Sequence, residues 1–507
     1  MTGLRKSPGS AVEVERTFEF SPAGPVPDLL GLVGIAEVQV LPVEHLDATY
    51  YDTADLRLVR LRTTLRRRRG GRDAGWHLKL PLGGDAREEV TLPLGRSTVV
   101  PGELRALVLS RTRAAALAPV VRLRTERTVR LLLDAGGSVL AELADDQVVG
   151  TTLGADRRRV AWRELEVELV AGDTALLDRL GRHLVGAGAR TSARPSKLAR
   201  TLEGLLPAAG PPLPRRPTAV DAVGRHLREQ YVELVSRDPG VRRDAPDAVH
   251  KMRVATRRLR SALATYRPLL ERAEVAPLGA ELKHLAAVLG QARDAEVLRE
   301  HLLGEIGLLP AGLVPATTAA AIAGQLQDAY RAAHDRVLEE LDGPRYTALL
   351  EALDHLVEQP PWTAAAQRPA AGQLRRQVRR SVARLDRVAA TAEAAPTAGQ
   401  RDELLHEVRK AAKQVRYATE STAPVLGKDA VRFARRVQRV QEALGDHQDS
   451  VVIRERIGAL ASDAGDGGFV LGVLYGLEQV RAEQTEHTYV QAWQGFSATS
   501  TRRWLRR

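Results

Sequence analysis

The chain has 507 residues, 44% of them hydrophobic and 27% charged, a composition that excludes wholesale disorder and allows several folded cores. Lys and Arg outnumber Asp and Glu, 75 to 63, so the formal net charge is +12. The absence of cysteine excludes disulfides, thiolate nucleophiles and Cys-based metal sites, and it favours a reducing compartment. Because no signal peptide or membrane-spanning segment is evident, we expect a cytoplasmic protein with no membrane partner.

Residues 1–206 have the pattern of an antiparallel β domain. Apolar and polar residues alternate in short segments separated by Gly, Pro and Asp, without the strand–helix–strand rhythm of a parallel sheet. These segments are VEVERTFEF (12–20), LRTTLRRRR (61–69), WHLKLPL (76–82), REEVTLPL (87–94), VVRLRTERTVRLLL (120–133), VLAELADDQVV (139–149) and RELEVELV (163–170). We therefore predict a mostly antiparallel sheet in this half.

Charged residues of one sign share strand faces in this half, because residues i and i+2 of a strand point to the same side. The acidic rows are Glu13 with Glu15, and Glu164 with Glu166 and Glu168; the basic rows are Arg66 with Arg68, and Lys79 beside His77. Inside a barrel, the carboxylates would suit a hard divalent cation and the cations would suit phosphate oxygens. The alternative is that each row forms the solvent-exposed face of a sheet.

Residues 207–217 (PAAGPPLPRRP) contain five prolines and predict a linker, since such a segment fits neither a helix interior nor a central strand. After it the apolar residues recur every three or four positions, and Ala, Leu, Arg and Glu dominate. Residues 218–505 are therefore predicted to form an all-helical domain, which makes the whole chain an α+β multidomain protein.

The helical half contains an internal repeat. VHKMRVATRRLR (249–260) is similar to LHEVRKAAKQVR (405–416), and LGQARDAEVL (289–298) is similar to LGDHQDSVVI (444–453). Both matches have nearly the same offset, 156 and 155 residues. This predicts a duplicated unit and a pseudo-symmetric pair of helical bundles.

The first segment of each copy predicts a helix with a basic face opposite an apolar face. The basic faces consist of His250, Arg253, Arg257 and Arg260 in the first copy and of His406, Arg409, Lys413 and Arg416 in the second. Like charges at this spacing repel, so an anion site is favoured over a solvated face. Few aromatic residues lie among the basic clusters, which counts against sequence-tolerant nucleic-acid binding and makes a polyanion without bases an equally good candidate.

These helices resemble the conserved-histidine α-helical domain, CHAD, over about residues 218–505. The resemblance implies a pair of four-helix bundles whose basic concave surface binds inorganic polyphosphate, and with it an association with polyphosphate granules. By position, the residues implied to face the phosphate chain are His250, Arg253, Arg257, His406, Arg409 and Lys413, assisted by Lys251, Arg260, Lys410 and Arg416.

The β half resembles the CYTH domain, the triphosphate tunnel fold, over about residues 11–204. The motifs that carry the resemblance are EVER, YYDTADLRL (50–58), TLRRRR (64–69), WHLKLP (76–81), REE (87–89), ELEVEL (164–169) and SKLAR (196–200). It implies an eight-stranded tunnel barrel that binds triphosphate-containing ligands with Mg²⁺ or Mn²⁺ and in many members hydrolyses them. The resemblance implies metal ligands at Glu13, Glu15, Glu166 and Glu168, with Glu164 as a further candidate. It implies phosphate ligands at Arg66, Arg68, Lys79, Arg87, Arg127 and Lys197. The implied catalytic residues are Glu13, Glu15, Lys79, Arg66 and Arg68.

One departure from the family pattern bears on activity. The family's opening motif is E-x-E-x-K, whereas the last position here is Thr17. Two functions follow: a metal-dependent triphosphatase acting on inorganic triphosphate or related linear phosphates, joined to a polyphosphate-binding domain, or a protein that binds polyphosphate without turnover. A nucleic-acid binder is a third and weaker alternative.

Overall fold

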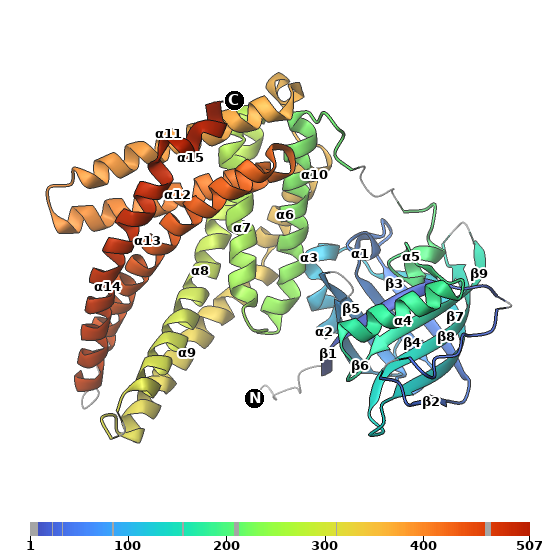
Figure 1. The fold of residues 1–507 in the computed structure, drawn as a ribbon. Coiled ribbons are helices and arrows are strands. Elements are labelled where there is room, and N and C mark those ends of the chain that lie inside the picture. Colours follow the sequence, from blue (N-terminus) through green and yellow to red (C-terminus); the bar gives the residue numbers. More distant parts are fainter. Residues whose placement is uncertain are drawn as a thin grey trace. The chain divides into compact units, whose positions relative to one another are not determined.

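The computed structural model describes residues 9–22, 24–32, 34–83, 86–154, 157–206, 212–310, 312–461 and 468–506. The chain divides into two compact units, residues 1–210 and 211–507 (Figure 1). Of the predicted Pro-rich linker, residues 207–211 lie outside the described residues.

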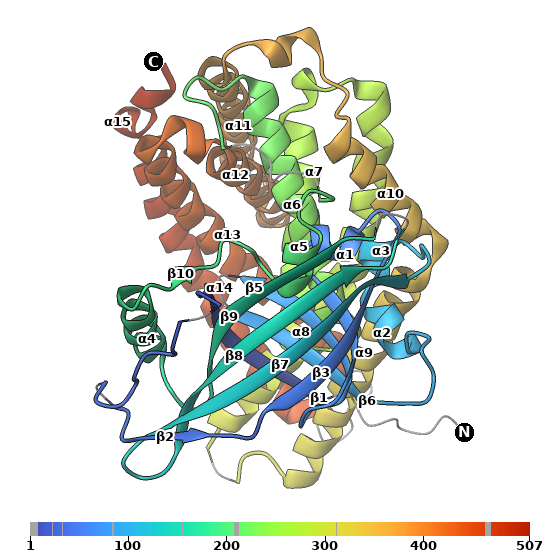
Figure 2. The ribbon, with the colours of Figure 1, turned by 90° about the vertical axis from the view of Figure 1, so that its right-hand side faces the viewer.

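The first unit is a closed antiparallel barrel of eight strands, which confirms the predicted fold class. The ring runs β1–β6–β5–β4–β3–β7–β8–β9, and β9 closes it by pairing with β1 (Figure 2). The strands are β1 (Gly9–Glu19), β3 (Glu44–Asp52), β4 (Thr64–Arg69), β5 (Gly75–Gly83), β6 (Ala86–Pro93), β7 (Ala118–Leu133), β8 (Val139–Thr152) and β9 (Arg159–Leu169). Two short strands add to the ring: β2 (Glu37–Val40) pairs with β7, and β10 (Arg190–Thr191) pairs with β1.

Two helices decide which strand face points into the barrel. The outward residues of β1 and β9, among them Phe18, Leu165 and Val167, are buried beneath α4 (Thr174–Gly186). Because a strand alternates its faces, burying these residues outside forces the glutamates between them inward. The short helix α5 (Lys197–Thr201) packs Leu198 and Ala199 into a second apolar cluster with residues of β3, β7, β8 and β9. The remaining helices of this unit are α1 (Arg57–Arg60), α2 (Gly102–Leu107) and α3 (Leu109–Thr112).

The second unit is helical and repeats a row of four long helices. The first row is α6 (Ala219–Arg242), α7 (Ala248–Thr265), α8 (Arg272–Leu308) and α9 (Ala316–Asp342); the second is α11 (Ala370–Glu393), α12 (Ala398–Leu426), α13 (Lys428–Ala461) and α14 (Gly468–Ser497). Between and after them lie α10 (Pro344–Glu358), α15 (Thr499–Arg502) and the 3₁₀ turns η1 (Arg267–Leu269), η2 (Ala364–Gln367) and η4 (Arg503–Arg506). Within each row every helix packs on the next, and the rows meet where α7 contacts α12 and α6 contacts α11. Among the helices described, none is both long and apolar enough to cross a membrane.

One contact recurs in both rows. The guanidinium of Arg253 on α7 lies 3.6 Å from the point where a Cβ on Gly290 of α8 would sit. In the second row the guanidinium of Arg409 on α12 lies 3.4 Å from the corresponding point on Gly445 of α13. The same arginine therefore lies over the same glycine in both rows, as expected for a duplicated unit.

Candidate functional site

The barrel encloses a charged cavity of about 80 Å³. Its lining includes six carboxylates, Glu13, Glu15, Asp73, Glu89, Glu166 and Glu168, and six cations, Arg66, Arg68, Lys79, Arg87, Arg127 and Lys197. All six predicted phosphate ligands and four of the five predicted metal ligands are thus brought together. The fifth, Glu164, is buried next to the lining, where it accepts a hydrogen bond from Trp162 Nε1 at 2.6 Å.

A row of carboxylates crosses three neighbouring strands. Glu15 of β1 lies opposite Glu168 of β9, and Glu168 lies opposite Glu142 of β8. Burial raises the pKa of Glu168; Lys79 opposes the rise, and Glu15 and Glu142 add to it. Like charges directly opposite each other are unfavourable in a sheet. The row is therefore a strongly negative wall that an added divalent cation would stabilise.

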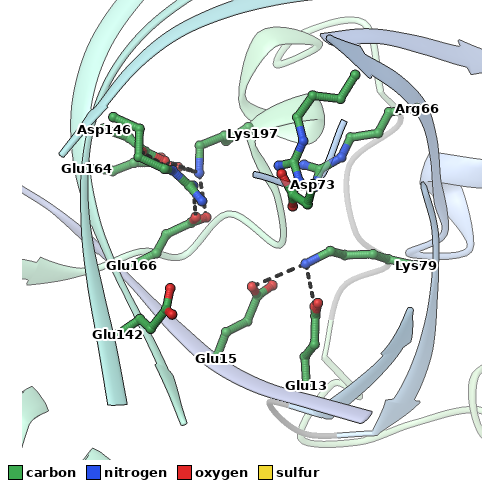
Figure 3. Close-up of polar contacts among 12 residues, drawn as sticks. Glu13, Glu15, Arg66, Asp73, Lys79, Glu142, Asp146, Glu164, Glu166 and Lys197 are labelled. Carbon is green, nitrogen blue, oxygen red and sulfur yellow. Dashed lines mark hydrogen bonds and ion pairs between the residues drawn. The ribbon is translucent and has the colours of Figure 1, made fainter. Parts of the chain in front are cut away.

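Lys79 lies at one end of this wall (Figure 3). Its Nζ is 2.5 Å from Glu13 Oε2, 3.5 Å from Glu15 Oε2 and 4.0 Å from Glu89 Oε1. Burial raises the pKa of Glu13 to about 8, and the neighbouring Glu89 adds to the rise while Lys79 opposes it. Burial therefore disfavours the charged form of Glu13, and a bound metal ion would favour that form.

A second acidic cluster carries its own cation. Oxygens of Asp146, Glu164 and Glu166 lie within 4.8 Å of one another, a spacing that suits a metal ion. Lys197 Nζ, however, lies 2.9 Å from Asp146, 2.7 Å from Glu164 and 2.5 Å from Glu166 (Figure 3). Burial alone would lower the pKa of Lys197, but the three carboxylates outweigh it and raise that pKa. Arg127 also donates to Asp146 and Glu166.

Local structure places Lys197 there. Ser196 caps α5 by accepting a hydrogen bond from the Ala199 amide at 3.1 Å, so Lys197 is the first residue of the helix. The donor set of the cavity, carboxylate oxygens without sulfur, fits Mg²⁺ or Mn²⁺. Lys197 already pairs with Glu164 and Glu166, and Lys79 pairs with Glu13 and Glu15. An added ion would therefore compete with these two lysines for four of the five predicted metal ligands.

The opposite wall is basic and incompletely neutralised. Among the described residues, Nε of Arg66 and Nε of Arg68 are buried without a hydrogen-bond partner. Burial lowers the pKa of Arg68 to about 9, and the nearby Arg66 and Arg127 lower it further. Phosphate oxygens that accept hydrogen bonds from the guanidinium groups of Arg66 and Arg68 would therefore stabilise these buried cations.

Sequence reasoning missed Asp73 and Glu89, which line the cavity, and Glu142 and Asp146, which pair with or lie opposite its predicted residues. Glu142 and Asp146 are four residues apart on one strand, so alternation places them on the same face, and that signal was present in VLAELADDQVV. Glu89 is two residues after Arg87 and shares its face; it lies 3.0 Å from His77 Nδ1. Asp73 follows β4 in a turn, where alternation gives no information.

The helical unit has a basic groove of about 240 Å³ between α7, α11 and α12. Four predicted phosphate ligands line it: Arg257, Arg260, Lys410 and Lys413. Arg384 of α11 also lines it, although the sequence reading did not select it. The signal for Arg384 was weak, because its helix carries many arginines and most of them are exposed.

The two basic faces converge beside this groove. Burial lowers the pKa of Arg257, and its neighbours Arg253, Arg409 and Arg260 lower it further, opposed by Tyr417. Arg409 belongs to the other copy of the repeat, so cations from both copies lie close together. Burial and Arg293 likewise lower the pKa of His250. This repulsion is what a bound polyanion would relieve.

The other predicted residues of the helical unit lie outside the groove lining. Lys251 is exposed and pairs with Asp247 at 3.5 Å, and Arg416 pairs with Glu420 at 3.0 Å. Arg253 lies 3.8 Å from Asp294. His250, His406 and Arg409 lie on the same helices as the groove, nearer their N-terminal ends.

Comparison with known proteins agrees with both architectures. The CYTH domain family matches residues 12–201, and the CHAD domain family matches residues 225–458. Two Mycobacterium tuberculosis proteins, Rv2226 of strain H37Rv and MT2285 of strain CDC 1551, are each 40% identical over 500 residues, covering 94% of both chains.

Among solved structures, PptA from Streptomyces chartreusis is 24% identical, with a TM-score of 0.46, over 55% of this chain and 99% of its own. The CHAD domain of Ricinus communis is 22% identical, with a TM-score of 0.44, over 59% of this chain and 96% of its own. A Hippeastrum protein described as a putative adenylyl cyclase with a dominant triphosphatase activity is 18% identical, with a TM-score of 0.23, over 39% and 97%. Since both domains match in order and a 40% identical relative aligns over nearly its whole length, the chain belongs to the family of proteins that join a CYTH domain to a CHAD domain.

Proposed function

We propose that the barrel hydrolyses inorganic triphosphate or a related linear phosphate with the help of a divalent metal ion. The observation that carries this proposal is the cavity in which a carboxylate row faces buried, incompletely paired arginines. Membership in the CYTH family supports a phosphate substrate, and the carboxylate oxygens that line the cavity support Mg²⁺ or Mn²⁺ as the ion.

The residues divide into two roles. Glu13, Glu15, Glu166 and Glu168 would hold the ion, which when bound shields the substrate from the acidic wall and polarises a phosphoryl oxygen. Lys79 and the arginines of the opposite wall orient the phosphates and stabilise the charge that develops on the leaving group. No covalent nucleophile is required for this chemistry.

The helical unit is proposed to bind inorganic polyphosphate in its basic groove. Repulsion among Arg257 and its neighbours from both copies supports this proposal, because a string of phosphates would neutralise cations that the chain itself leaves close together. A polyphosphate-binding unit would also hold the protein at cytoplasmic polyphosphate granules.

Turnover tests the barrel directly. In the full-length protein with Mg²⁺ or Mn²⁺, we expect phosphate release from tripolyphosphate, and we expect Glu13→Ala and Glu166→Ala each to reduce it at least about 100-fold by removing a metal ligand. The measurement is colorimetric phosphate release against tripolyphosphate, pyrophosphate and ATP. Glu126→Ala, an exposed carboxylate next to Arg127 on the outer face of β7, is the matched control and should retain activity. Unchanged activity in Glu166→Ala would contradict the assignment.

Binding without turnover is the second candidate, and Thr17 favours it. Thr17 lines the cavity and lies opposite Glu166, where the family pattern has a lysine. If the wild-type barrel binds tripolyphosphate without hydrolysing it, Thr17→Lys is expected to introduce turnover by adding a phosphate ligand. The same release assay measures this, and Thr17→Met serves as a control for side-chain size. Turnover by the wild type would exclude the second candidate.

A further inference from the structure

A second cavity in the helical unit, of about 200 Å³, lies between α6 and α12. It shares only Tyr417 with the lining of the basic groove. Helix α6 contributes Ala222, Arg225, His226, Glu229 and Gln230, and α12 contributes Tyr417, Glu420, Ser421, Pro424 and Val425. Both sets follow helical spacing of three and four, so each is a single face of its helix turned towards the other. Arg258 of α7 and Leu213 complete the wall.

The α6 face is largely polar and partly exposed: Glu229 is exposed, and Arg225 and His226 are half-buried. Gln230 is only 9% exposed, and among the described residues its side-chain oxygen has no hydrogen-bond partner. A buried acceptor without a donor destabilises the folded state. No described residue of the wall donates a hydrogen bond to the Gln230 side-chain oxygen. A bound molecule that donates this hydrogen bond would explain why the oxygen is buried.

The charges of the wall neutralise one another. Arg258 Nη2 lies 3.2 Å from Glu420 Oε2, and Arg416 also pairs with Glu420. Burial lowers the pKa of His226 to about 4, and Arg258 lowers it further. The imidazole is therefore neutral at physiological pH and offers one donor and one acceptor. Such a wall favours an uncharged ligand with hydrogen-bonding groups.

Two more features describe the ligand. Pro424 lies within α12 and has no amide hydrogen, so it cannot donate the usual helical hydrogen bond to the Glu420 carbonyl. The guanidinium groups of Arg258 and Arg416 lie 5.6 Å and 5.2 Å from the centre of the Tyr417 ring, so flat groups already stack on one another at the edge of the cavity. Flat groups of this kind stack on planar rings.

We propose that this cavity binds a planar, uncharged nitrogen heterocycle of nucleobase size, held by an N–H donated to Gln230 and by His226. The inference does not depend on phosphate hydrolysis or polyphosphate binding. The heterocycle could be a free base or the base of a nucleotide, and the two sources are separated by using adenine and ADP as probes.

The experiment is saturation-transfer NMR of the full-length protein with adenine. Adenine is expected to bind the wild type, and Gln230→Leu is expected to weaken binding at least about tenfold because the acceptor is lost. Gln438→Leu, on α13 outside the cavity, is the matched control and should bind like the wild type. ADP binding that falls in parallel with adenine binding in Gln230→Leu would identify a nucleotide as the source.

Thermal unfolding without ligand separates this role from a structural one. Gln230→Leu is expected to unfold at the same temperature as the wild type or higher, since the variant buries no unpaired oxygen. A lower unfolding temperature would show that Gln230 serves the fold and would overturn the proposal. Absence of adenine binding to the wild type, or equal binding to Gln230→Leu, would also overturn it. ADP binding that survives Gln230→Leu and is displaced by polyphosphate would assign ADP to the basic groove instead.

Discussion

Replacement of Lys197 by methionine is expected to destabilise the barrel by about 3–5 kcal/mol, because it leaves three buried carboxylates with too little positive charge. Lys197 Nζ lies within 3 Å of Asp146, Glu164 and Glu166, and its side chain is only 9% exposed. Removing one member of such a cluster lowers the free energy of unfolding by more than the intact cluster adds to it, because the remaining charges stay buried without a partner. Urea unfolding of the full-length protein, followed by a signal from the barrel tryptophans, measures the loss.

The pH dependence of this loss identifies its cause. In the wild type, Lys197 and Arg127 outweigh burial and lower the pKa of Glu166, so its ionisation stabilises the fold above the unfolded pKa. Without Lys197, burial would raise the pKa of these carboxyls, and their ionisation would then oppose folding above the unfolded pKa. The difference from the wild type should therefore be largest near pH 8 and should shrink towards pH 5, where the carboxyls take up protons.

Two variants control this experiment. Lys197→Arg retains the positive charge and should recover part of the stability. Arg159→Met removes an exposed cation from the same barrel and should change stability by less than about 0.5 kcal/mol. An equal loss at pH 5 and pH 8 for Lys197→Met would show that packing, and not charge, explains the role of Lys197.

The triple variant His250→Ala/Arg257→Ala/Lys413→Ala is expected to weaken polyphosphate binding at least about 100-fold at constant salt. Two charged hydrogen-bond donors and one imidazole are lost, and a charged hydrogen bond contributes about 1.5–3 kcal/mol. The slope of log affinity against log salt should fall by about two, one for each phosphate-binding cation removed. Isothermal titration at several salt concentrations measures both quantities.

Arg331→Ala/Arg336→Ala is the matched control for charge. It removes two exposed cations from α9, which does not line the groove, and therefore changes net charge as Arg257→Ala/Lys413→Ala does. Its affinity should stay close to that of the wild type. If the triple variant binds polyphosphate like this control, the groove is not the binding site. Competition by single-stranded DNA equal to that of polyphosphate would favour a nucleic-acid binder.

Periodicity predicted most of the fold. Seven of the eight barrel strands contain a segment that alternating apolar and polar residues predicted to be a strand. Both basic helices lie where basic residues spaced by three and four positions predicted them. The eighth strand, β3, was not located from the sequence; the resemblance to the CYTH domain implied eight strands without giving its bounds. The register between strands was not predictable, because pairing Glu15 with Glu168 and Thr17 with Glu166 depends on ring closure, which no local pattern encodes.

The sequence predicted which side chains lie close together when they share a strand or a helix. It was less informative where tertiary contacts determine which side chains meet. Strand alternation placed Glu13 beside Glu15 and Arg66 beside Arg68. It could not show that Lys197 inserts between Asp146, Glu164 and Glu166, because that contact depends on how α5 packs. The cavity around Gln230 was equally hidden, since a glutamine among helical polar residues has no distinguishing pattern.

The position of α5 in the chain has a consequence for biosynthesis. The acidic cluster is assembled from β8 and β9, whereas Lys197, the ammonium at its centre, belongs to a helix that leaves the ribosome after every strand of the ring. A nascent barrel that stops at β9 carries an unbalanced negative interior. Completion of the ring should therefore await the emergence of α5, which couples the final folding step of this unit to the end of its own translation.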